Sequence, residues 1–154
     1  MQDKVKVLFL CKGNAARGQI AEGFVNAEAG EHFAAESAAT ASSDLNPLAV
    51  EVMQEVGIDI SGEKSKTIPE VFRERFSYVV GICNTKRERC PVFPFTYKLM
   101  QWSVDDPAAA TASRDEQVRV LRNIREQIRN NVREFLQGTG KEAERALIAA
   151  HAAR

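Results

Sequence analysis

A cysteine and an arginine flank a short polar turn near the start of the chain. Cys11 follows the apolar run 4–10, and Arg17 comes just before residues with helical spacing. A free cysteine has a pKa of about 8.5, so a thiolate at neutral pH needs a helix start or nearby cations. The N–H groups of such a turn also bind tetrahedral oxyanions, which an arginine can hold with two donors. The stretch favours an oxyanion pocket with a reactive thiolate over its alternative, a structural cysteine near an unrelated arginine.

The residues of the turn suit that pocket. Gly13 lets the backbone approach a ligand closely, Asn14 can brace a tight turn, and Lys12 adds a positive charge beside the thiol. The predicted oxyanion-binding residues are Lys12, Gly13, Asn14, Ala15, Ala16, Arg17 and Gly18.

Two further cysteines flank a basic hexapeptide. Cys83 follows an apolar run and Cys90 precedes a proline. If the segment between them were helical, their Cα atoms would lie about 10 Å apart, whereas a disulfide needs about 4.4–6.8 Å. A bridge between them therefore requires the segment to unwind. The alternative is a packing role for two small apolar residues.

Apolar runs alternate with amphipathic stretches along the chain. Strands are expected at residues 4–10, 32–39, 76–82 and 95–104, and helices at 18–29, from Pro47 to Gly57, from Thr67, and from Ser113 to Gly138. This alternation predicts a three-layer α/β fold with a central four-stranded, mainly parallel sheet flanked by helices. Ligands of such sheets bind beyond the carboxyl ends of the strands, where Cys11 and Cys83 are expected.

The chain of 154 residues fits one domain, which we place at residues 1–138, with residues 139–154 as a helical or disordered extension. Its 21 basic and 21 acidic residues balance, which argues against a nucleic-acid or membrane-surface binder. The short apolar run at the start is not typical of a signal peptide, and three cysteines do not suggest a structural disulfide framework. We therefore expect a cytoplasmic protein, and a monomer.

The stretch from Val5 to Gly23 resembles the loop of the low-molecular-weight protein tyrosine phosphatases and of the arsenate reductases that share their fold. The family pattern is Cys-x-Gly-Asn-Ser-x-Arg-Ser followed by Gln-x-Ala-Glu, and the likeness continues to about Leu136. Two residues depart from it, because Ala15 and Gly18 stand where the family has serines. The missing hydroxyl at Gly18 is expected to raise the pKa of the thiol, and Lys12 to lower it.

The pair Cys83 and Cys90 resembles that of the thioredoxin-coupled arsenate reductases. The resemblance implies that Cys11 attacks arsenate, that Cys83 then attacks Cys11 and releases arsenite, and that Cys90 attacks Cys83. Thioredoxin, the external reductant, would reduce the final disulfide by thiol exchange.

The resemblance also assigns a role to Asp106, which precedes Pro107 in an Asp-Asp-Pro turn. In the family this aspartate is the general acid that protonates the leaving oxygen, and Asp105 is the second choice. The aromatic residues that phosphatases of the family carry after this proline are replaced by alanines, which weakens phosphotyrosine recognition.

Some arsenate reductases of this fold hold a potassium ion near the loop. Asn14, Glu22 and Ser37 resemble part of that site, but Lys66 aligns loosely with its aspartate. We therefore expect no metal or other resident cofactor, with the Lys66 ammonium replacing the ion.

Three functions stay open. The leading hypothesis is a thioredoxin-coupled arsenate reductase with catalytic residues Cys11, Arg17, Cys83, Cys90 and Asp106. The first alternative is a phosphatase that hydrolyses phosphomonoesters through a phosphocysteine at Cys11, and the second is a non-catalytic oxyanion-binding or redox-sensing domain.

Overall fold

The structure is a computed structural model, and it describes residues 4–11, 16–39, 45–64, 66–71, 74–83, 98–105 and 113–152. The five strands are β1 (Val5–Cys11), β2 (Phe33–Ala39), β3 (Lys66–Thr67), β4 (Tyr78–Cys83) and β5 (Leu99–Ser103). The helices are α1 (Ala16–Ala29), α2 (Pro47–Gln54), α3 (Ile68–Val71), α4 (Arg114–Gln137) and α5 (Thr139–Ala152).

The strands form one sheet in the order β3-β2-β1-β4-β5, and every neighbouring pair is parallel. The expected α/β class and parallel sheet are confirmed. The expected count of four strands is wrong by one, because β3 has only two residues. Such a short strand leaves no alternating pattern in the sequence.

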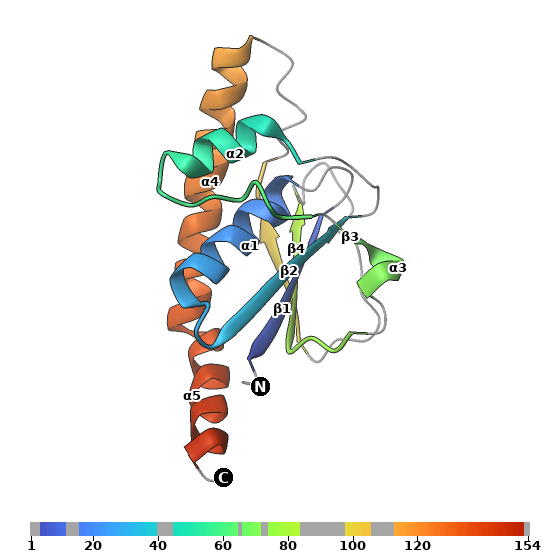
Figure 1. The fold of residues 1–154 in the computed structure, drawn as a ribbon, viewed down its shortest axis with the longest axis vertical. Coiled ribbons are helices and arrows are strands. Elements are labelled where there is room, and N and C mark those ends of the chain that lie inside the picture. Colours follow the sequence, from blue (N-terminus) through green and yellow to red (C-terminus); the bar gives the residue numbers. More distant parts are fainter. Residues whose placement is uncertain are drawn as a thin grey trace.

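Residues of β1 alternate between the two faces of the sheet and so build two apolar cores. Val5, Val7 and Phe9 belong to the larger cluster, whereas Leu8 and Leu10 belong to the smaller one. Helices α1, α2 and α4 lie on one side of the sheet and α3 on the other (Figure 1). The layers are therefore helix, sheet and helix, as the pattern predicted.

Local signals place the two helices that frame the larger core. Asn46 caps α2 by accepting the N–H of Leu48 (2.9 Å), and Ser113 caps α4 by accepting the N–H of Glu116 (3.3 Å). The apolar stripe of α4 is buried against the larger core at Val118, Leu121, Ile124, Ile128, Val132 and Phe135.

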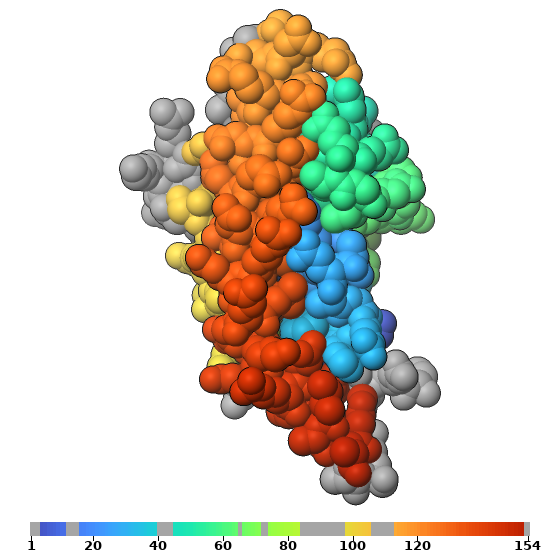
Figure 2. All heavy atoms as spheres, turned by 90° about the vertical axis from the view of Figure 1, so that its left-hand side faces the viewer, coloured from blue at the N-terminus to red at the C-terminus, as the bar shows by residue number. Residues whose placement is uncertain are grey.

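Residues 139–152 form a helix that packs on the domain. The Tyr78 hydroxyl donates to the carbonyl of Thr139 (3.1 Å), and Ala143 and Leu147 pack against the larger core. Figure 2 shows α4 and α5 as one continuous ridge beside α1 and α2. None of the described helices is long and apolar enough to cross a membrane.

Candidate functional site

Cys11 is the last residue of β1 and is fully buried. It is a reduced thiol, and its sulfur accepts a hydrogen bond from the backbone N–H of Gly18 (3.0 Å). Because Gly18 lies in the first turn of α1, the positive end of that helix faces the sulfur. This arrangement favours the thiolate, the form of cysteine that attacks an electrophile.

Gly18 leaves no room for a side chain at this point. A Cβ atom there would lie 3.0 Å from the sulfur of Cys11 and 3.1 Å from Cβ of Ser37. The family's serine hydroxyl is absent, but a main-chain N–H of the same residue contacts the sulfur. Close packing of α1 on β1 and β2 thus accompanies this departure from the family pattern.

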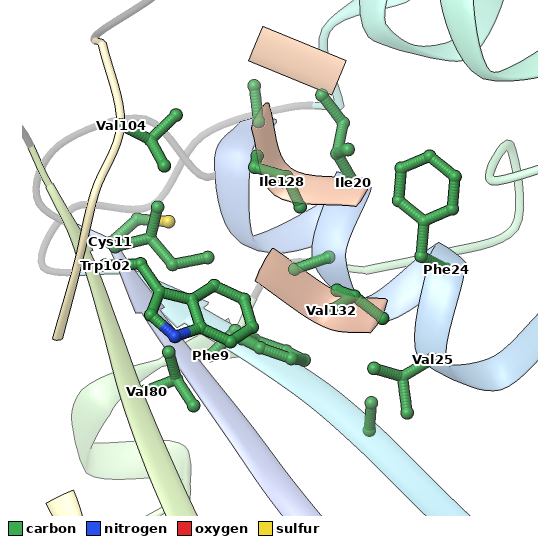
Figure 3. Close-up of a cluster of buried hydrophobic side chains, with 14 of the residues drawn as sticks. Phe9, Cys11, Ile20, Phe24, Val25, Val80, Trp102, Val104, Ile128 and Val132 are labelled. Carbon is green, nitrogen blue, oxygen red and sulfur yellow. The ribbon is translucent and has the colours of Figure 1, made fainter. Parts of the chain in front are cut away.

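Arg17 precedes Gly18 in α1 and is buried, with 1% of its surface exposed. Its Nη1 donates to the carbonyl oxygen of Val104, just after β5 (3.2 Å). Arg17 directly precedes Gly18, whose N–H contacts the sulfur. A guanidinium group at this position can hold a tetrahedral anion against the thiolate. The structure therefore brings Cys11, Ala16, Arg17 and Gly18 together at the carboxyl edge of the sheet, and Figure 3 shows Cys11 near Val104 at one end of the buried cluster.

Cys83 is the last residue of β4 and is also fully buried. Its neighbour in the chain, Ile82, is the register partner of Cys11 on β1, so the two cysteines end adjacent strands at the same edge, as expected. Cys83 takes part in a disulfide, whereas Cys11 does not. The described residues thus contain one thiol and one disulfide sulfur at this edge.

Six of the predicted site residues lie outside the described residues: Lys12, Gly13, Asn14, Ala15, Cys90 and Asp106. Their predicted roles stay predictions. Asp105, the second choice for the general acid, is described and exposed directly after Val104.

A pair of carboxyl groups lies behind the thiol. Glu22 of α1 accepts a hydrogen bond from the Ser37 hydroxyl (3.1 Å), and both residues are buried. Burial raises the pKa of Glu22, and burial together with the neighbouring Glu22 carboxyl raises the pKa of Glu63. Glu22 was noted in the sequence analysis, but Glu63 was missed because no motif or periodic pattern surrounds it.

This carboxyl pair is relevant to whether the protein binds a potassium ion, as some arsenate reductases of this fold do. The oxygens of Glu22 and Ser37, with Glu63 beside them, are of the kind that a monovalent cation binds. Lys66 forms its ion pairs with Glu36 and with Glu74. Among the described residues, no group of three or more histidine, cysteine, aspartate or glutamate side chains is arranged to hold a metal ion.

Sequence comparison agrees with the geometry of the site. The family model of the low molecular weight phosphotyrosine protein phosphatases matches residues 6–145. An arsenate reductase of Bacillus subtilis is 37% identical over 141 residues, which are 92% of this chain and 100% of that protein.

The comparison with solved structures also finds arsenate reductases. An arsenate reductase in the phosphate-binding state superimposes with a TM-score of 0.72 at 30% identity, covering 89% of this chain and 98% of that one. A thioredoxin-dependent arsenate reductase from Corynebacterium glutamicum has a TM-score of 0.67 at 25% identity, covering 91% of this chain and 64% of that one. The chain therefore belongs to the low molecular weight phosphotyrosine protein phosphatase family, in the group whose curated relatives are arsenate reductases.

Proposed function

We propose that this protein is an arsenate reductase that is recycled by thioredoxin. The observation that carries the proposal is the pair of buried cysteines at the ends of adjacent parallel strands. One is a thiol that accepts an N–H at the start of α1 beside Arg17, and the other is a disulfide sulfur. A phosphatase needs the first cysteine alone, whereas a two-electron reduction also needs the second.

In the first step the Cys11 thiolate attacks arsenic(V) and forms an As–S bond. The loop N–H groups from Lys12 to Gly18 and the Arg17 guanidinium hold the remaining oxygens. One oxygen leaves as water after protonation, for which Asp106 is the proposed general acid. No electron has yet been transferred, and arsenic remains in the +5 state.

In the second step the Cys83 thiolate attacks the sulfur of Cys11. An S–S bond forms, the As–S bond breaks, and its electron pair stays on arsenic, which leaves as arsenite. The Cys90 thiolate then attacks Cys83, so Cys11 departs as a thiolate and a Cys83–Cys90 disulfide remains. Two thiols of thioredoxin reduce that disulfide and are themselves oxidised.

Arsenate-dependent consumption of NADPH, coupled through thioredoxin and thioredoxin reductase, tests this proposal. We expect turnover by the wild type and none by Cys11→Ala, Cys83→Ala or Cys90→Ala. Hydrolysis of a small aryl phosphate is the internal control, because it requires Cys11 and should survive the Cys83 and Cys90 substitutions. Arsenate turnover that persists in Cys90→Ala would exclude the relay and point to a low-molecular-weight thiol as reductant. Aryl phosphate hydrolysis without any arsenate turnover would favour the phosphatase.

We further propose that the enzyme acts as a cytoplasmic monomer without a resident cofactor. A potassium ion held by Glu22 and Ser37 would contribute positive charge behind the loop. Whether a potassium ion binds there is tested by melting curves of the protein in potassium, sodium and choline chloride at equal ionic strength. Equal melting temperatures are expected, and a specific rise in potassium would contradict the proposal.

A further inference from the structure

A hollow lies at the edge of the sheet where the strands begin, at the opposite end from Cys11 and Cys83. The start of β4, the residue before β5 and the start of α5 supply its walls, which include Arg75, Ser77, Tyr78, Lys98, Glu142 and Ala143. Its volume is about 490 Å³, within the range of about 300–1,000 Å³ that is typical of small-molecule pockets. Because β4 is six residues long, the hollow is separated from Cys83 by about 17 Å.

The wall that α5 contributes is fixed to the domain at two points. The Tyr78 hydroxyl donates to the carbonyl of Thr139 (3.1 Å), and the Glu144 carboxylate lies 3.3 Å from Nδ1 of His32. Figure 1 shows α5 at the end of the molecule where β1 begins. The hollow is therefore formed by the folded chain before any ligand arrives, as is usual for small-molecule sites.

One side of the hollow is apolar and the other is cationic. The Tyr78 ring, which is 4% exposed, and Ala143 make the apolar side. The Lys98 ammonium lies 5.7 Å from the centroid of the Tyr78 ring, at the border of the two sides. Arg75 is exposed and pairs with no carboxylate among the described residues. Glu142 sets one negative charge against these two positive ones.

Three classes of ligand fit these walls unequally. A small inorganic oxyanion meets the two cations but leaves the apolar side in water. A neutral apolar molecule covers that side but offers no charge to the guanidinium and the ammonium. An organic anion does both, because its charged group accepts N–H bonds from the cations while its body removes apolar surface from water.

We propose that this hollow is a second binding site, which takes a small organic anion with an aromatic or aliphatic body. The charged group of the ligand lies between Arg75 and Lys98, and its body packs on the Tyr78 ring and Ala143. The site goes beyond the proposed arsenate reduction and does not depend on it, because none of these residues lies at the carboxyl edge of the sheet.

Fluorescence titration with 8-anilinonaphthalene-1-sulfonate tests the site, because this dye joins a sulfonate to aromatic rings and brightens when the rings leave water. One saturable site per chain is expected. Sodium octanesulfonate, an aliphatic organic anion, should displace the dye, whereas sodium sulfate at equal ionic strength should not. Displacement by sulfate would overturn the proposal, because the dye would then occupy a site for inorganic anions.

Substitutions in the walls separate the charge of the hollow from its shape. Arg75→Met and Lys98→Met should each weaken dye binding about fivefold, a usual size for an exposed ion pair, and Glu142→Gln should strengthen it by removing a like charge. Ser77→Phe should abolish dye binding, because the larger side chain occupies the hollow. Arg145→Met is the matched control, since it removes an exposed arginine of α5 that does not line the hollow.

Circular dichroism and urea unfolding verify that each variant is folded before titration, because the dye also binds partly unfolded chains. Equal dye affinity in the wild type, Arg75→Met and Ser77→Phe would overturn the site, as would equal weakening by Arg75→Met and Arg145→Met. Absence of saturable binding by the folded wild type would overturn it as well. Arsenate turnover is measured separately, and its absence would remove the proposed function without affecting this site.

Discussion

Gly18→Ala adds one methyl group at the point where α1 lies closest to β1 and β2. The added carbon would lie 3.0 Å from Sγ of Cys11 and 3.1 Å from Cβ of Ser37, both on buried strands that have little room to move. Overpacking of this kind costs about 1–3 kcal/mol of folding free energy. Each kcal/mol lowers the Tm of a domain of this size by about 2–4 °C, so we expect a fall of about 2–12 °C. The displaced sulfur should also lose part of its N–H contact, and its alkylation should slow.

Urea unfolding and thermal melting, followed by circular dichroism, measure the stability change. Gly62→Ala is the matched control, because a Cβ at Gly62 meets no atom within 4 Å and the backbone there has no positive φ. The control should leave stability unchanged or raise it by up to about 1 kcal/mol through the unfolded state. If the two variants unfold at the same urea concentration and Cys11 reacts equally fast in both, the steric explanation of Gly18 is wrong.

Three other perturbations test different parts of the structure. The pKa of Glu22 is raised to about 7 and that of Glu63 to about 9, so the folded state holds more protons than the unfolded one, and stability should fall as pH rises from about 4.5 to 9. Glu63→Gln should flatten this fall in urea titrations at pH 5.5, 7 and 9, and a parallel fall would contradict it. Removal of residues 139–154 should destabilise the protein by about 2 kcal/mol in urea unfolding, because Leu147 loses its contact with the core. Phe135→Ala should cost about 3–5 kcal/mol by the same measurement, since its ring packs on three other aromatic rings.

The elements predicted from the sequence are those in which one strong pattern spans many residues. The apolar runs of β1 and β4 and the long stripe of α4 are present near their expected bounds. The strand β3 was missed because two residues cannot show a period. The ends of elements also shifted. The helix α1 starts at Ala16 rather than Gly18, and Ala16 and Arg17 precede Ile20, where the apolar spacing behind the prediction begins.

The features of the candidate site also divide into those that sequence patterns predict and those that they do not. Sequence patterns predicted Cys11, Arg17 and Cys83 as site residues, because side chains of these types can carry the proposed chemistry and the two cysteines follow predicted strands. They assigned Gly18 a missing hydroxyl, whereas the structure shows a main-chain N–H on the sulfur and no space for a side chain. The partner of Arg17 is likewise a carbonyl oxygen, which every residue possesses. Contacts made by the main chain depend on the fold and cannot be read from residue types.

Burial of both cysteines constrains how the proposed relay can run. Cys11 and Cys83 are each fully buried and end neighbouring strands, and the register partner of Cys11 is Ile82. Because successive side chains of a strand point to opposite faces of the sheet, attack of one sulfur on the other requires the end of β4 to rearrange. Attack of thioredoxin on Cys83 has a different requirement, because a second protein must then reach a sulfur that is buried in this structure. The last described main-chain bond at the end of β4 runs from the N–H of Val104 to the carbonyl of Cys83. If thioredoxin attacks Cys83, outward movement of this cysteine must break that bond or carry the end of β5 with it.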